Sequence, residues 1–125
     1  MEILFEDQDV VVCIKPVGLD SEHELPARLG GDIYTVHRLD KNVGGVMVYA
    51  KNKESAAKLS KQIQSGEMIK EYVAMVEETP PEEGVWEDLL FKDSRKNKVF
   101  VVDRQRAGVK TAKLSYKRQI GRAHV

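Results

Sequence analysis

One stretch of the sequence places a charged loop, residues 36–41 (VHRLDK), before a glycine pair and an apolar strand, residues 43–50 (VGGVMVYA). The glycines allow a sharp bend or the close approach of a ligand. Asp40 lies between Arg38 and Lys41, and from the sequence these two cations are expected to favour the ionised carboxylate. Such an aspartate, on a loop held by a strand, can act as a nucleophile or a general base. The same residue types also form structural ion pairs and turn caps, so residue type alone leaves both roles open.

Composition indicates a soluble globular protein. The chain has 125 residues, of which 42% are hydrophobic and 32% charged, and this length fits one domain or part of one. No apolar run approaches the roughly 20 residues of a membrane span, and the acidic N-terminus does not resemble a signal peptide. The single cysteine, Cys13, excludes an internal disulfide and a cysteine-based zinc cluster. We therefore expect a cytoplasmic protein with no metal site and no membrane association, and its oligomeric state is not specified.

The net charge of zero hides an asymmetry along the chain. Residues 1–91 contain 9 Lys and Arg against 18 Asp and Glu, whereas residues 92–125 contain 11 against 2. A basic block of this kind can bind a polyanion, because each neutralised phosphate releases counterions. It can equally be a solvated surface that balances the acidic half, and the charge pattern alone does not decide between the two.

The spacing of apolar residues predicts an α+β fold with a mixed, mainly antiparallel sheet and flanking helices. Strands are expected at residues 3–5, 9–15, 43–50, 68–77, 85–91, 98–103 and 109–117. The apolar run at residues 10–14 is consistent with a buried strand. A helix should begin after Asn52 as its N-cap and end near Gly66, and a short helical turn is expected within residues 21–29. Lys70 and Tyr72 should share one face of the strand at residues 68–77.

Three motifs occur in a specific order: residues 14–19 (IKPVGL), the VHRLDK loop with its glycine-containing strand, and residues 70–74 (KEYVA). Together they resemble the core of the RluA-type RNA pseudouridine synthases, over about residues 9–117. The resemblance implies the pseudouridine synthase fold and an enzyme that isomerises uridine to pseudouridine in rRNA or tRNA. RNA would be the partner, and neither a cofactor nor a metal would be needed.

The resemblance also implies roles for single residues. Asp40 matches the catalytic aspartate, which either adds to C1′ of the ribose or removes the C2′ proton. Tyr72 matches a second catalytic residue, a tyrosine that packs on the target base and can assist proton removal at C5. Arg38 matches an arginine that helps displace the flipped base, and His37 and Lys70 are expected to support the loop and contact the RNA backbone. These types suit a reaction in which a base leaves its stack and is detached, rotated and rejoined.

The chain departs from the family pattern in two places. Where the family usually has Thr-Ser-Gly or a similar sequence after the aspartate motif, this chain has residues 43–45 (VGG). The family also has a later Thr-Gly-Arg-x-His-Gln-Ile-Arg segment, whose arginine pairs with the catalytic aspartate. Arg122 follows the strand at residues 109–117 too closely to be this arginine, so we do not assign the role to Arg122.

The last six residues, 120–125 (IGRAHV), resemble the translation of a sequencing adapter, and a natural frayed tail is the alternative. We expect residues 1–119 to form the N-terminal part of a catalytic domain, little more than half of it, with no preceding small RNA-binding domain. Two other functions stay open. The chain can be a non-catalytic RNA-binding fragment that lacks the arginine segment, or a structural or interaction protein.

Overall fold

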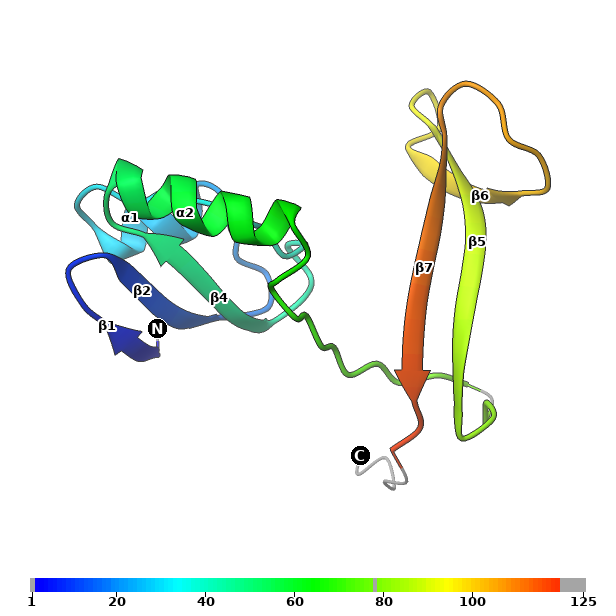
Figure 1. Ribbon diagram of the computed structural model, residues 1–125, viewed down its shortest axis with the longest axis horizontal. Coiled ribbons are helices and arrows are strands. Elements are labelled where there is room, and N and C mark those ends of the chain that lie inside the picture. Colours follow the sequence, from blue (N-terminus) through cyan, green and yellow to red (C-terminus); the bar gives the residue numbers. More distant parts are fainter. Residues whose placement is uncertain (1, 78, 120–125) are drawn as a thin grey trace. The chain divides into compact units, whose positions relative to one another are not determined.

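The computed structural model describes residues 2–77 and 79–119, which form two compact units, one ending at Tyr72 and one beginning at Val73 (Figure 1). The proposed tail, residues 120–125 with Arg122, lies outside the described residues. None of the helices within the described residues is long and apolar enough to cross a bilayer.

The first unit is a four-stranded antiparallel sheet with two helices. The strands are β1 (Ile3–Glu6), β2 (Val10–Lys15), β3 (Tyr34–Thr35) and β4 (Gly45–Ala50), in the order β1-β2-β4-β3. The helices α1 (Glu24–Leu29) and α2 (Lys53–Gln64) lie over one face of this sheet (Figure 1). The two-residue strand β3 is the one strand of this unit that was not predicted from the sequence, because it is too short to leave a periodic pattern.

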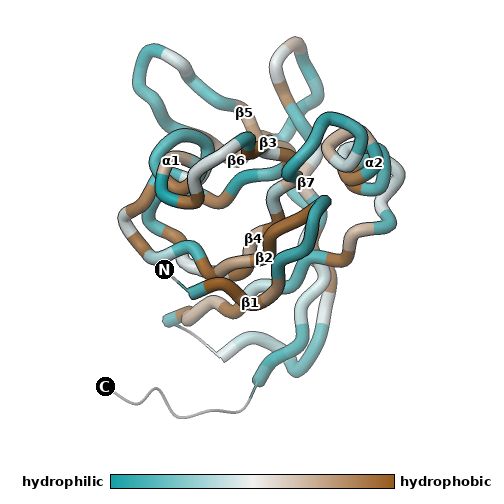
Figure 2. Tube along the Cα trace, turned by 90° about the vertical axis from the view of Figure 1, so that its left-hand side faces the viewer, coloured by the Kyte–Doolittle hydropathy of each residue, from teal (hydrophilic) through white to brown (hydrophobic). Residues whose placement is uncertain are grey.

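The core of this unit lies on the sheet face that the helices cover. Cys13 pairs with Met47 and Val11 with Tyr49, and none of these four side chains is more than 1% exposed. Leu25 of α1 joins the same cluster. The apolar run of β2, brown in Figure 2, is therefore fully buried only at alternate positions, since successive side chains point to opposite faces.

The helix α2 begins as predicted. The side chain of Asn52 accepts a hydrogen bond from the Ser55 N–H at 2.8 Å, which satisfies one of the free donors of the first turn. At the other end, Gly66 has a φ of 77° and its N–H donates to the Ile63 carbonyl at 3.2 Å. Both predicted ends of this helix are confirmed.

The second unit is a three-stranded antiparallel sheet. It consists of β5 (Glu83–Asp93), β6 (Lys98–Val102) and β7 (Val109–Lys117), with β5 in the middle. The three strands predicted in this half of the sequence are confirmed, as is the α+β class with mainly antiparallel pairing.

The strand predicted at residues 68–77 is wrong, since this segment has no regular secondary structure. Its alternating apolar side chains are largely exposed, with Ile69 at 84%, Tyr72 at 64% and Val73 at 87%. Alternation marks a chain that is suited to a sheet, but a strand also needs a neighbour for its N–H and C=O groups. No segment within the described residues pairs with it.

Candidate active site

The loop that carries Asp40 connects β3 to β4, and a buried lysine holds one side of it. Lys15 is 0% exposed, and its Nζ donates to the carbonyl oxygens of Pro16 at 3.0 Å, Leu19 at 2.8 Å and Lys41 at 3.1 Å. An ammonium has three donors, so all of them are used. A buried charge is tolerated only when it is compensated in this way. Lys15 therefore ties the turn after β2 to the residue that follows Asp40.

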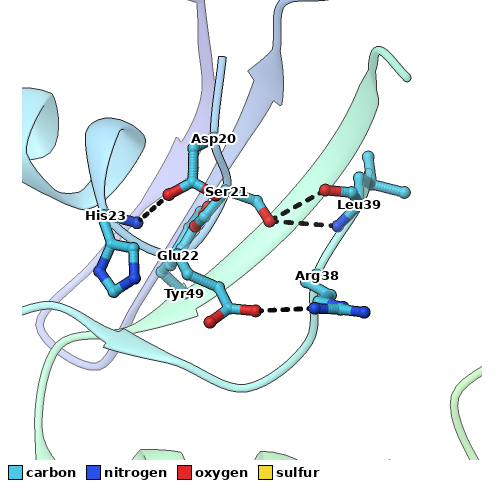
Figure 3. A network of polar contacts seen from close by, with 7 residues as sticks. All are labelled: Asp20, Ser21, Glu22, His23, Arg38, Leu39 and Tyr49. Atoms are coloured by element: carbon cyan, nitrogen blue, oxygen red, sulfur yellow. Dashed lines mark hydrogen bonds and ion pairs between the residues drawn. The ribbon is translucent and has the colours of Figure 1, made fainter. Parts of the chain in front are cut away.

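A second set of hydrogen bonds holds the other side of the loop (Figure 3). The Ser21 hydroxyl donates to the Leu39 carbonyl at 3.0 Å and lies 3.3 Å from the Leu39 N–H, from which it accepts. The Tyr49 hydroxyl donates to the Ser21 carbonyl at 2.5 Å, and burial raises the pKa of this phenol far above its ordinary value. Leu39 itself is 9% exposed and packs in the core.

Asp40 thus has a fixed backbone and an exposed side chain. Leu39 before it and Lys41 after it are both hydrogen-bonded to buried side chains, and the Asp40 carbonyl accepts from the Val43 N–H at 2.9 Å. The carboxylate is exposed. A side chain presented in this way can meet a substrate without a prior rearrangement of the loop.

The glycine pair serves the packing of two loops against each other. A Cβ on Gly44 would lie 3.2 Å from the Val17 Cγ2 and 3.3 Å from the Lys15 carbonyl oxygen, which is tighter than ordinary contact. Gly18, in the facing turn, has a φ of 91°, and its N–H donates to the Lys41 carbonyl at 2.7 Å. The glycine pair was predicted to allow a sharp bend or the close approach of a ligand; the close approach at Gly44 is to the turn after β2.

His37 is half-buried against the edge of β4. Its Nε2 accepts a hydrogen bond from the Val48 N–H at 3.1 Å, beyond the point where the short strand β3 ends. This bond uses the lone pair that a proton would occupy, so it requires the neutral ring. Burial lowers the pKa of His37, and the nearby Lys70 cation lowers it further. His37 accordingly holds the start of the loop on the sheet.

Arg38 lies on the surface near Glu22, which precedes α1. Its Nη1 is 3.4 Å from the Glu22 Oε1, and the two side chains are 71% and 42% exposed (Figure 3). An exposed pair of this kind contributes about 0–1 kcal/mol. Arg38 can therefore exchange Glu22 for another anion at little cost.

The structure brings the sequence-predicted residues together only in part. His37, Arg38 and Asp40 share one loop, and Lys70 lies near enough to His37 to influence its pKa. Lys70 and Tyr72 are exposed, and in the described part of the chain no hydrogen bond joins Tyr72 to Asp40. Residues 2–77 and 79–119 contain no group of His, Cys, Asp and Glu side chains that could hold a metal ion.

Three residues that support the loop were not predicted from the sequence: Lys15, Ser21 and Tyr49. Lys15 did leave a signal, because it continues the alternation of Val11 and Cys13 and so points a cation into the core face. Ser21 left none, since its partner Leu39 lies 18 residues away.

Comparison with known proteins identifies the family. A model of the RNA pseudouridylate synthase family matches residues 9–119, and the chain belongs to this family. A human protein, RNA pseudouridylate synthase domain containing 4, has the same fold, with a TM-score of 0.66 and 24% identity over 93% of this chain and 52% of that one. The pseudouridine synthase fold predicted from the sequence is therefore confirmed.

Several curated relatives are similar in sequence. The uncharacterized RNA pseudouridine synthase MG209 homolog of Mycoplasma pneumoniae is 36% identical over 61% of this chain and 28% of its own length. The tRNA pseudouridine(31) synthase of Saccharomyces cerevisiae is 37% identical over 59% of this chain and 21% of its own length. The dual-specificity RNA pseudouridine synthase RluA of Vibrio vulnificus is 39% identical over 60% of this chain and 34% of its own length. The chain thus spans a minor part of these relatives.

Replacing the buried Lys15 ammonium should destabilise the protein. We expect Lys15→Met to lower the free energy of unfolding by about 2–4 kcal/mol, because the carbonyls of Pro16 and Leu19 lose a buried donor. Urea denaturation followed by circular dichroism measures the change. Lys53→Met, at an exposed position of α2, is the matched control and should change stability by less than about 0.5 kcal/mol. Equal stability of the two variants would contradict this role of Lys15.

His37 should make the stability of the protein depend on pH. Because its pKa is lowered in the folded state, the unfolded chain binds more protons than the folded one just below about pH 6.5. The stabilisation is therefore present above about pH 6.5 and is lost as the pH falls through the lowered pKa. Urea denaturation between about pH 5 and pH 7 should show a steeper loss for the wild type than for His37→Gln, whose amide oxygen can still accept from Val48. Parallel pH profiles would rule this out.

Proposed function

We propose that the protein carrying this chain isomerises uridine to pseudouridine in ribosomal or transfer RNA, and that Asp40 is its reacting carboxylate. Residues 1–119 would form the N-terminal part of the catalytic domain. Membership of the RNA pseudouridylate synthase family supports the reaction. The observation that supports Asp40 is its geometry, an exposed carboxylate between two residues whose backbones are bonded to buried side chains.

The reaction breaks the bond between N1 of uracil and C1′, rotates the base, and forms a bond between C5 and C1′. Asp40 can contribute in two ways, by bonding to C1′ or by taking the C2′ proton. Both require a carboxylate held at a set position beside the ribose, because a small misplacement of a reacting group is costly. The bonds of Lys15 and Ser21 to the neighbours of Asp40 meet this requirement.

The other site residues receive roles around the base and its backbone. We assign Tyr72 to stacking on the target base and to proton removal at C5, for which its 64% exposed ring is available. Arg38 would take the place of the flipped base, and its exposed pair with Glu22 can be given up for that purpose. Lys70 would contact an RNA phosphate, and His37 would act on RNA binding through the position of the loop.

We place the reaction in the cytoplasm, where transcribed RNA is processed and where a lone thiol such as the buried Cys13 stays reduced. The base stays in the pocket between its detachment and its reattachment, so holding it in place takes the role of an activating cofactor.

Removing the charge of Asp40 should abolish the reaction. In the full-length protein we expect Asp40→Asn to lower pseudouridine formation by at least about 100-fold while RNA is still bound. Carbodiimide labelling of pseudouridine in bulk tRNA and rRNA measures the product, and a filter assay measures binding. Asp32→Asn, at another exposed aspartate in the same unit, is the matched control and should keep full activity. Persistent activity of Asp40→Asn would falsify the assignment.

A second candidate is RNA binding without turnover. It is favoured by one observation, that no ion pair to the Asp40 carboxylate is formed within the described residues, whereas the family pairs its catalytic aspartate with an arginine of a later segment. The same labelling assay on the 125-residue chain separates the two candidates. Salt-dependent RNA binding with no pseudouridine above background would favour the binding fragment.

A further inference from the structure

The positive charge of the second unit is concentrated at one end of its sheet. The two connecting segments, residues 91–98 and 103–110, meet there, because Phe91 pairs with both Phe100 and Val109, Asp93 pairs with Lys98, and the Arg106 guanidinium lies over the Phe91 ring. We call these two segments the turn end. Its only carboxylates are Asp93 and Asp103. Its cations are Lys92, Arg95, Lys96, Lys98, Arg104, Arg106 and Lys110.

The opposite end of the sheet is close to neutral. There the exposed lysines of β7 stand directly across from carboxylates of β5, Lys113 from Glu87 and Lys117 from Glu83. Directly opposite side chains have Cβ atoms about 5 Å apart, so their fields largely cancel in solution. At the turn end the corresponding lysine, Lys110, stands across from Leu90.

Most cations of the turn end are not neutralised locally; the exception is Lys98, which stands directly across from Asp93. The Asp93 carboxylate accepts from the N–H groups of Arg95 at 3.0 Å and Lys96 at 3.3 Å, so it is engaged in forming the turn. Within the described residues none of the turn-end cations forms an ion pair. Lys92 stands across from the apolar Val99.

Two of these cations lie over aromatic rings. The Arg106 guanidinium is 4.5 Å from the centroid of the Phe91 ring, and the Lys96 Nζ is 6.0 Å from that of Phe100. Phe91 and Phe100 are cross-strand partners. Such contacts keep the cations near the sheet surface while their donors stay free for an outside acceptor. The turn end is thus a positively charged surface that can bind a polyanion.

We propose that the turn end is an RNA-backbone contact, a surface in a different unit of the chain from the Asp40 loop. The proposal rests on the proposed function for the choice of RNA as the polyanion, and it adds the place of contact. A row of phosphates can meet several of these cations at once, and each phosphate that is neutralised releases counterions. The contact would position the RNA without reading its sequence.

The test compares two double variants of the 125-residue chain with the same change in charge. K92Q/K110Q removes two exposed strand lysines of the turn end, and K113Q/K117Q removes two exposed strand lysines of the opposite end. Binding to bulk tRNA is measured as a function of salt concentration. For K92Q/K110Q we expect the slope of log Kd against log salt to fall by about two, and for K113Q/K117Q the slope of the wild type should be retained.

Equal effects of the two double variants would mean that RNA binding follows net charge alone, and the proposal would be overturned. Unchanged binding by K92Q/K110Q, beside a wild type that binds, would overturn it as well. Neither result touches the proposed reaction, which is judged by Asp40→Asn in the full-length protein. Pseudouridine formation could therefore stand while this contact fails, or the reverse.

A second measurement needs no variant and so does not depend on how a variant folds. The wild-type chain is treated with an amine-acetylating reagent, with and without bulk tRNA, and the modified lysines are located by mass spectrometry. RNA should protect Lys92, Lys96, Lys98 and Lys110 at least severalfold more than Lys113 and Lys117. Uniform protection, or protection of the opposite end, contradicts the proposal.

Discussion

The buried ammonium of Lys15 is the interaction on which the first unit depends. It lies at the end of β2, on the core face, and its three donors are all used by main-chain carbonyls. No carboxylate takes part, so the charge is compensated by oriented dipoles that the fold itself must place. The turn after β2 and the loop before β4 therefore depend on each other, because both supply carbonyl oxygens to the Lys15 Nζ.

The sequence predicted the local features of this unit and missed the distant ones. The N-cap at Asn52, the helix that follows and the β4 strand are encoded by residues within a turn or two of each other, and these predictions are confirmed. The bond of Ser21 to Leu39 joins residues 18 positions apart, and the bond of Lys15 to Lys41 joins residues 26 apart. Such contacts follow from the fold, and the sequence does not show which residues they join.

The same distinction explains why the strand predicted at residues 68–77 is wrong and why the turn end is not apparent in the sequence. Alternation describes a side-chain pattern, whereas a β-strand also needs a second strand to pair with. No described segment pairs with residues 68–77. The basic block was visible in the sequence as a change of charge along the chain. Its concentration at one end of a sheet was not, because that follows from the register that sets Lys113 across from Glu87 and Lys110 across from Leu90. The roles of Asp40 and Tyr72 came from the family resemblance and stay proposals.

Both supports of the Asp40 loop act on its main chain. Lys15 binds the carbonyl of Lys41, and Ser21 binds the carbonyl and the N–H of Leu39, so neither depends on which side chain stands at position 38, 40 or 41. The hydrogen bonds that hold the loop thus do not involve the side chains that the loop exposes. Substitutions at positions 38, 40 and 41 would therefore leave these main-chain hydrogen bonds in place, so the loop offers positions at which other functional groups could be introduced.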